Sequence, residues 1–478
     1  MTDITKKQYV LSSCPLLLEN MQKYSVGNMY LYVGEGLLVK ERRNAEGKNT
    51  ILLGNVFCVD APNKVPEEDI VSFSGNRIIS ATRFWTGRWV LLSETELVTD
   101  ASGLMSAFYY AKGDAFCVSS SLALMAEVTQ MTMDQEVKAD GLSWQLLPGS
   151  RLEGVKKLLC TQQIRFEANA MRVEESGRFK KLCALSTDEK CKTLAEMLVN
   201  AAKNIHTYSE KSIVLALTGG KDSRLSFAAL LKSGIPFSAY TAEHKNMSSS
   251  DKTVPAMLCK RFGVVHRFVR RKAYNRELRA DYRGFCGGDS NDADARFYAH
   301  GQFADFDSET LVIRSGLFEA AQTYARSYTS PNGEGFYRGM VGYYTDLRVS
   351  ERQRASFDAW YKNATEHPLE GVDIRDRFYV EQRVGGWTAA IEQSLDINDF
   401  TSIQIANCEA ILSVLLSCSE EERRTLALSY GTIRLLEPRT LQTPINKRSI
   451  RDRLLRIGSI LKDPFGKLTR FVHKKLRR

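Results

Sequence analysis

The sequence of 478 residues contains no apolar run that approaches the roughly 20 residues of a membrane span, and its start, Met-Thr-Asp-Ile-Thr-Lys-Lys, lacks the apolar core of a secretory signal. The ten cysteines include no Cys-x-x-Cys pair, which disfavours zinc ribbons and thioredoxin-type redox sites. Proline is scarce, with 11 residues, which disfavours extended disorder. We therefore expect a cytoplasmic protein whose cysteines are small, buried core residues.

Excess positive charge is missing from most of the chain. The net charge is +10, but residues 447–478 hold twelve Lys and Arg and two Asp, so the preceding 446 residues are neutral overall. The body of the protein therefore lacks the basic surplus that nucleic-acid binding requires, and we expect no specific nucleic-acid partner.

The C-terminal tail has a pattern of its own. Apolar residues recur every three or four positions with Lys and Arg between them, at Ile450, Leu454, Ile457, Leu461, Phe465, Leu468, Val472 and Leu476. This basic amphipathic pattern is typical of a helix on an anionic membrane surface, and it predicts peripheral contact of residues 447–478 with the inner membrane face. A helix packed on the protein body is an alternative of equal weight, and RNA binding is a lesser one.

The first part of the chain is predicted to be β-rich. Short apolar or alternating runs, separated by Gly and Asp, occur at 29–33, 50–53, 88–92, 107–110, 115–118 and 163–166. Residues 174–181 are mostly polar and are predicted to be a linker. A helix is predicted from Thr187 to about His206.

Strands and helices alternate from Ser212 onward. Strands are predicted at 212–217, 237–241, 264–269 and 310–314, helices at 224–232 and 250–262, and mainly helix over 340–440. The first of these strands is almost entirely apolar, as in a strand buried on both faces of a sheet. The predicted fold class is α/β: a β-rich N-terminal sandwich domain, then a doubly wound parallel sheet with a helical C-terminal part.

The turn after the first parallel strand has the features of a phosphate site. Gly219 and Gly220 let the backbone approach an anion closely, and the helix that follows offers free N–H groups. Thr218 and Ser223 add hydroxyl groups, and Asp222 can hold a magnesium ion, which prefers carboxylate oxygen. The spacing is not that of a Walker loop. A glycine-rich turn without a ligand is the structural alternative.

This stretch, Thr218-Gly-Gly-Lys-Asp-Ser223, resembles the Ser-Gly-Gly-x-Asp-Ser loop of the N-type ATP pyrophosphatases, with Thr in place of the first Ser. In that family the loop grips the pyrophosphate that is released when a carboxylate or carbonyl oxygen attacks the α-phosphate of ATP. The resemblance implies ATP and Mg²⁺ as cofactors. It implies ATP-binding positions at Leu217, Thr218, Gly219, Gly220, Asp222, Ser223, Arg224, Tyr240 and Thr241.

The N-terminal half resembles the class II glutamine amidotransferase domain of asparagine synthetases. The segments that carry this likeness, in order, are Gly87-Arg-Trp-Val-Leu-Leu, Asp100-Ala-Ser-Gly103, Phe108-Tyr-Tyr and Phe116-Cys-Val-Ser-Ser-Ser-Leu122. The resemblance covers most of residues 80–440. It predicts a degenerate amidotransferase-like domain at 1–180, an asparagine synthetase-like ATP pyrophosphatase domain at 187–445, and a basic amphipathic tail at 446–478.

One departure from that family concerns the amine donor. The amidotransferase nucleophile is a Cys directly after the initiator Met, whereas Thr2 stands here and the first cysteine is Cys14. An internal cysteine has no free α-amine to assist it, so we expect the glutaminase to be lost. The amine is then a bound amine substrate or ammonia. β-Lactam synthetases and lasso-peptide cyclases, which the chain also resembles, combine a lost glutaminase with a working synthetase.

A second departure follows the fourth parallel strand. Asparagine synthetases carry Ser-Gly-Asp-Gly-Ala-Asp-Glu there, and this chain keeps Ser315-Gly316 and a single acid, Glu319. Glu319 is predicted to be a second magnesium ligand, with an ordinary ion pair to Arg314 or Arg326 as an equal alternative. Arg314, at the carboxyl end of a parallel strand, is expected to bind the substrate carboxylate.

Two further residues are predicted to act in catalysis. Glu381, with Arg383, is expected to line the acceptor site, although helix-surface charges are the commoner explanation of such a pair. Lys447 is the nearest candidate for the family's late catalytic lysine. The predicted function is an ATP-dependent ligase that adenylates a small-molecule or glycan-linked carboxylate and forms an amide. The alternative is a catalytically degenerate nucleotide-binding protein.

Overall fold

The computed structural model describes residues 3–445 except 74–76, 135–141, 143, 168–169, 180–181, 183, 244–246, 271–280, 283, 288–305, 323–332 and 345–348. Lys447 and the rest of the basic tail lie outside these residues, as does Arg326. No helix in the described part of the chain is long and apolar enough to span a bilayer. Every described cysteine except Cys14 is buried, as the sequence predicted.

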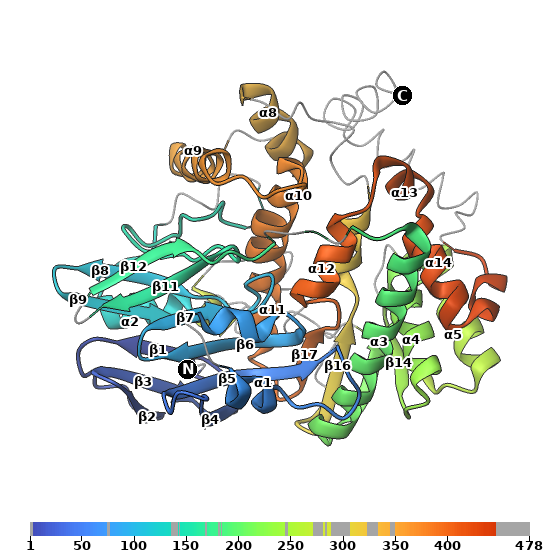
Figure 1. Ribbon diagram of the computed structural model, residues 1–478, viewed down its shortest axis with the longest axis horizontal. Coiled ribbons are helices and arrows are strands. Elements are labelled where there is room, and N and C mark those ends of the chain that lie inside the picture. The colour runs from blue at the N-terminus through green and yellow to red at the C-terminus, as the bar shows by residue number, and fades with distance from the viewer. Residues whose placement is uncertain are drawn as a thin grey trace.

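The N-terminal half is a sandwich of two antiparallel sheets, seen on the left of Figure 1. One sheet has the order β10-β8-β9-β1-β3-β2, with β1 Tyr9–Ser12, β2 Met21–Val26, β3 Met29–Gly34, β8 Phe108–Lys112, β9 Ala115–Ser119 and β10 Lys156–Lys157. The other has the order β12-β11-β7-β6-β5-β4, with β4 Val39–Arg43, β5 Asn49–Cys58, β6 Trp85–Ser93, β7 Glu96–Thr99, β11 Gln162–Glu167 and β12 Ala170–Glu175. The short helices of this half are α1 Pro66–Ser72, η1 Ile78–Thr82 and α2 Leu122–Thr129.

The two sheets share an apolar core. Because successive side chains of a strand point to opposite faces, alternate residues of each sheet turn inward. Tyr9, Leu11 and Leu31 of the first sheet meet Ile51 and Val90 of the second. The β-rich sandwich that the sequence predicted is confirmed.

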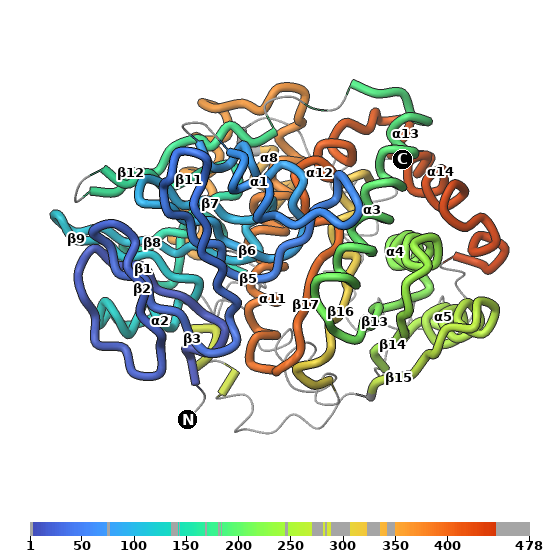
Figure 2. The backbone as a smooth tube through the Cα atoms, turned by 60° about the horizontal axis from the view of Figure 1, so that its bottom comes forward, coloured from blue at the N-terminus to red at the C-terminus, as the bar shows by residue number. Residues whose placement is uncertain are grey.

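The second half is built on a five-stranded parallel sheet of order β15-β14-β13-β16-β17, which Figure 2 shows strand by strand. The strands are β13 Ser212–Ala216, β14 Ser238–Glu243, β15 His266–Arg270, β16 Thr310–Arg314 and β17 Thr401–Gln404. Helices α3 Thr187–Ser209, α4 Lys221–Ser233 and α5 Ser249–Phe262 pack on one face, together with α12 Glu409–Leu416 and α14 Ala427–Leu436. The remaining elements are η3 Gly316–Ala321, α8 Gly333–Tyr344, α9 Glu351–Glu366, α10 Ile374–Phe378, the π-helix η5 Tyr379–Thr388, α11 Ala389–Leu395, α13 Glu420–Thr425 and η6 Pro438–Gln442.

The strand order defines where a ligand is expected. The chain moves outward from β13 to β15 on one side and from β16 to β17 on the other, so the order reverses between β13 and β16. Ligands of open α/β sheets bind outside the carboxyl ends of the strands at such a reversal. The doubly wound sheet and the mainly helical stretch predicted at 340–440 are confirmed, and β17 adds within that stretch a fifth strand that the sequence did not predict.

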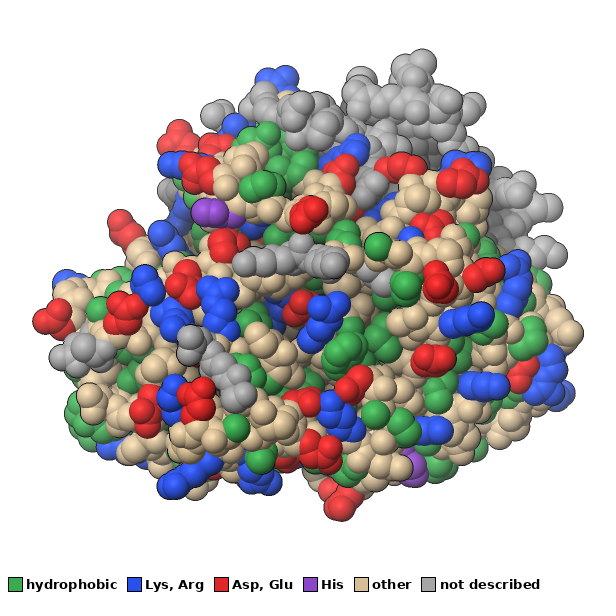
Figure 3. Space-filling view, viewed as in Figure 1, with side chains coloured by type: hydrophobic (Ala, Val, Ile, Leu, Met, Phe, Trp, Pro, Cys, Tyr) green, Lys and Arg blue, Asp and Glu red, His purple; other side chains and the backbone are tan. Residues whose placement is uncertain are grey.

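Helix α11 lies between the two halves, near the centre of Figure 1. Leu395, at its end, packs on the second face of the parallel sheet with Val312 and Phe400. On the face shown in Figure 3, the described acidic and basic side chains are interspersed, as expected for a body without net charge.

Candidate functional site

The predicted phosphate loop joins β13 to α4 at the reversal point. Gly220 is the N-cap of α4, and the helix begins at Lys221. The amide of Thr218 donates to Ser223 Oγ at 3.0 Å, and Gly220 N–H donates to Thr218 Oγ1 at 3.2 Å. Thr218 is exposed, and Gly220 and Asp222 are partly exposed. The loop is therefore a solvent-accessible helix start, which suits an anionic ligand.

A second helix start supports the same loop. Gly219 N–H donates to Asp251 Oδ1, in the first turn of α5, at 2.7 Å. A Cβ placed on Gly219 would lie 2.3 Å from Ser250 Oγ and 3.0 Å from the Ser250 backbone carbon, so only glycine fits there. Ser250 is buried, and its hydroxyl has no hydrogen-bond partner among the described residues. A buried hydroxyl without a partner costs about 1–3 kcal/mol, which is consistent with a ligand at this position.

Three predicted ATP-binding residues, Leu217, Tyr240 and Thr241, have buried side chains. Leu217 is a core residue, and its carbonyl accepts a hydrogen bond from Thr241 Oγ1 at 2.8 Å. Tyr240 is buried and packs edge-on against Phe306, with 5.3 Å between ring centroids. Thr241 also contacts His266 Nε2 at 2.9 Å. Thr241 thus holds the backbone of Leu217, just before the loop, to β14.

Two carboxylates, those of Asp222 and Glu319, interact electrostatically at the start of α4. Lys221 Nζ lies 3.1 Å from Asp222 Oδ1, and Gln322 Nε2 donates to the same oxygen at 3.4 Å. Burial, and then the charge of Asp222, raise the pKa of Glu319, while Lys221 acts in the opposite direction. Tyr379 donates to Glu319 Oε2 at 3.4 Å. The two predicted metal ligands, Asp222 of α4 and Glu319 of η3, are therefore near enough for their charges to interact.

The fit of this pair to a metal ion follows from its composition. Among the described residues, no group of three or more His, Cys, Asp or Glu could hold a metal ion. Magnesium in nucleotide sites is usually bound by one or two carboxylates together with phosphate oxygens and water. Asp222 and Glu319 fit that pattern and do not form an all-protein metal cage.

Arg314 is the last residue of β16, and its side chain points toward α11. Its Nη1 lies 2.8 Å from Glu392 Oε1, and Glu392 is almost completely buried. Arg314, one of the two arginines weighed as an ion-pair partner of Glu319, thus pairs with Glu392. The other, Arg326, lies outside the described residues.

The structure places Arg224 and Glu381 away from the roles that the sequence predicted. Arg224 is fully buried and donates to the backbone carbonyls of Thr440, Thr443 and Pro444. Its guanidinium therefore anchors the C-terminal segment and does not face the loop.

Glu381 is also fully buried. It pairs with Arg377 at 3.1 Å and accepts hydrogen bonds from Trp360 Nε1 and Thr161. Its carboxylate thus holds the π-helix to its neighbours and is not exposed toward an acceptor. Lys447 lies outside the described residues.

Some residues near the loop were not predicted from the sequence. Asp251 was missed, although Ser248-x-x-Asp251 is a recognisable helix-start signal. Tyr379 was also missed, because it reaches Glu319 across 60 residues of sequence, which no local pattern reveals. Arg383, which was predicted to line the acceptor site, has a charge that acts on Glu319. Arg383 Cζ lies 3.5 Å from the ring centroid of Trp387, so the aromatic ring supports its cationic group.

No protein-family model matches the chain, and no curated protein matches it in sequence. Solved structures that it resembles include a glutamine phosphoribosylpyrophosphate amidotransferase from B. subtilis complexed with ADP and GMP, at 10% identity and TM-score 0.23 over 55% of this chain and 85% of that one. An NMN synthetase from Francisella tularensis matches with 13% sequence identity and a TM-score of 0.20, over 38% of this chain and 95% of that one. A glutamine-dependent NAD+ synthetase from Acinetobacter baumannii, in complex with ADP, matches with 13% sequence identity and a TM-score of 0.20. The match covers 70% of this chain and 68% of that one. These values are too low to assign a family or a function.

Proposed function

We propose that the chain is an asparagine synthetase-like, ATP- and Mg²⁺-dependent ligase that activates a substrate carboxylate as its adenylate and joins it to an amine. The observation that supports this most is the accessible loop Thr218–Ser223, which lies where the strand order reverses and beside the carboxylates of Asp222 and Glu319. This is the arrangement that a nucleotide with its magnesium ion requires.

Different residues of the proposed site bind the phosphates, bind the metal ion and balance the charge. Bound magnesium ATP supplies an electrophilic α-phosphate and a pyrophosphate leaving group. The first turn of α4 and the Thr218 hydroxyl hold the terminal phosphates, with Asp222 and Glu319 as the metal ligands. Lys221 balances the carboxylate charge at 3.1 Å from Asp222. Fixed donors of this kind stabilise the charge that develops on the leaving group.

Substrate binding is assigned to the carboxyl end of β16. Arg314 orients the carboxylate of a small-molecule or glycan-linked acid, since a guanidinium matches a carboxylate in geometry and charge. Lys447, which lies outside the described residues, is proposed to act on the phosphate side of the reaction as the counterpart of the late catalytic lysine of asparagine synthetases.

The amine is proposed to enter directly, without a glutaminase step. Just before β1, Lys6 and Lys7 donate to the carbonyls of Ile397 and Asn398, respectively. The first cysteine, Cys14, follows β1 and is exposed. Thr2 stands where the amidotransferases carry their nucleophilic Cys, and this supports a lost glutaminase.

The alternative is a binding protein of the same fold without turnover. One feature favours it: a single acid, Glu319, remains in the segment after β16. An exchange assay between ATP and radiolabelled pyrophosphate, run over a panel of carboxylic acids, decides between the two. Exchange that depends on an acid and is lost in Asp222→Ala supports the ligase. Asp358→Ala, which removes an exposed carboxylate paired with Arg354 on α9, is the matched control. ATP binding without exchange for any acid would favour the binding protein.

A further inference from the structure

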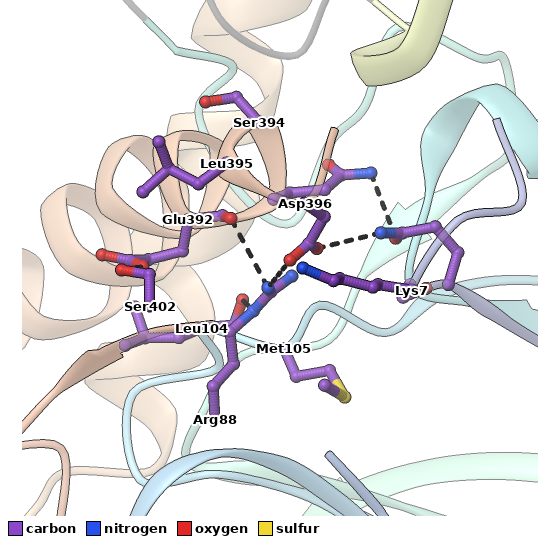
Figure 4. Close-up of polar contacts among 12 residues, drawn as sticks. Lys7, Arg88, Leu104, Met105, Glu392, Ser394, Leu395, Asp396 and Ser402 are labelled. Carbon is purple, nitrogen blue, oxygen red and sulfur yellow. Dashed lines mark hydrogen bonds and ion pairs between the residues drawn. The ribbon is translucent and has the colours of Figure 1, made fainter. Parts of the chain in front are cut away.

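Helix α11 connects the sandwich to the parallel sheet through buried charges. Asp396, directly after the helix, lies 2.6 Å from Arg88 Nη1 of β6, and both side chains are about nine-tenths buried (Figure 4). Gln8 Nε2 donates to the other Asp396 oxygen at 2.9 Å. Arg88 also donates to the Glu392 carbonyl at 3.4 Å and to the Leu104 carbonyl at 3.2 Å.

Helix α11 itself contacts the end of β16 through the side chain of Glu392. Glu392 Oε1 accepts from Arg314 Nη1 and from Gln404 Nε2, each at 2.8 Å. Gln404 Oε1 in turn accepts from the amide of Gly316 at 2.8 Å. Glu392 therefore fixes both the side chain at the end of β16 and, through Gln404, the backbone turn that leads to Glu319.

Glu392 and Asp396 lie one helical turn apart, so a shift of α11 moves both contacts together. Lys7, on the sandwich side, adds donations to the carbonyls of Asn398, Asp399 and Phe400, at 2.8–2.9 Å. The segment that follows α11 is thus held by the first residues of the chain. Buried ion pairs of this kind contribute little net stability, because desolvation offsets their attraction, and a role in fixing one geometry is their better explanation.

We propose that the sandwich serves as a positioning module, and that Glu392 is the positioning residue through which Arg88 and Asp396 hold Arg314 and the Gly316 turn. The positioning role depends on the proposed function only in one respect, namely the ligand that Arg314 binds. The mechanical link itself requires no turnover, and it gives a domain without a glutaminase nucleophile a role in the reaction.

Hydrogen–deuterium exchange of the full chain tests the link. The amide of Gly316 reports on it directly, because its acceptor, Gln404, is oriented by Glu392. Asp396→Asn is expected to raise the exchange rate of the peptide spanning residues 313–319 at least tenfold, with β13 and β14 unchanged. Lys6→Ala is the matched control, since it removes an ion pair to Asp399 at the same interface that lies outside the Glu392 contacts.

A double variant, Arg88→Met with Asp396→Leu, guards against misfolding, because it leaves neither charge buried alone. It is expected to give the same local increase in exchange. Glu392→Gln is expected to raise the KM for the acid in the exchange assay about tenfold and to leave the KM for ATP within twofold. Unchanged exchange at 313–319, or an equal rise across all strands of the sheet, would overturn the proposal, whether or not the protein proves to be a ligase.

Discussion

Gly219 and Asp251 are joined by a 2.7 Å hydrogen bond between the backbone amide of one and the carboxylate of the other. This contact links the turn after β13 to the start of α5, so the loop is fixed by two helix starts. Asp251 is also bound by the Ser248 hydroxyl at 2.7 Å. The loop is therefore formed before any ligand arrives, which lowers the entropic cost of binding.

Gly219→Ala is expected to weaken ATP binding at least tenfold. Its Cβ would lie 2.3 Å from Ser250 Oγ and 3.0 Å from backbone, and the forced shift costs about 1–3 kcal/mol. Titration calorimetry measures the affinity for ATP, and thermal unfolding measures the loss of stability. Gly284→Ala is the control, because its Cβ meets nothing within 4 Å. Wild-type affinity in Gly219→Ala would show that the close approach to Ser250 is irrelevant.

As the pH is lowered, magnesium affinity is expected to decrease at a higher pH than it would for an ordinary glutamate ligand. Burial and Asp222 raise the pKa of Glu319, so its proton competes with the metal at higher pH than usual. Affinity rises as pH increases through this pKa, because the carboxylate becomes charged. A magnesium titration in the presence of ATP between pH 5 and 8 measures the slope, and Glu319→Gln should flatten it. A slope that persists in that variant would assign the titration to another group.

Arg224→Met is expected to lower the free energy of unfolding by about 2–4 kcal/mol, because buried carbonyls lose their donor. Denaturant unfolding measures this. The structure predicts little direct effect on nucleotide contacts in the folded protein. Loss of ATP binding with full stability would instead support the contact that the sequence predicted.

The tail is expected to bind anionic membranes. Replacing Lys467, Arg470 and Lys474 with Glu should reduce sedimentation with phosphatidylserine-containing vesicles at least tenfold, since each basic residue near such a surface contributes about 1 kcal/mol. Vesicles of neutral phosphatidylcholine are the control. If the unmodified protein and the triple variant sedimented equally with anionic vesicles, membrane binding through these basic residues would be contradicted. A helix packed on the protein body would then be favoured.

The sequence predicted the elements whose patterns are local. The strand at 310–314 was found at those residues, and the helix expected from Thr187 begins there and continues to Ser209. Strand β17 was missed because its four residues, Thr-Ser-Ile-Gln, carry no apolar run and depend on pairing with β16. Strand pairing of this kind is set by distant contacts.

The site was predictable where chemistry and spacing coincide. The loop at 218–223 follows its strand and opens its helix as expected. The partners of Arg224 and Arg314 lie 216 and 78 residues away in sequence, so neither the anchoring of 440–444 nor the pair with Glu392 could be seen in advance. A charge in a sequence indicates that a partner is needed and does not identify it.

Whether the start of α4 holds the terminal phosphates of a nucleotide can be measured by titrating the full chain with magnesium pyrophosphate in a calorimeter. We expect saturable one-site binding that weakens at least tenfold in Asp222→Ala and is unchanged in Asp358→Ala. No binding to the unmodified protein, or equal affinity in all three proteins, would contradict it.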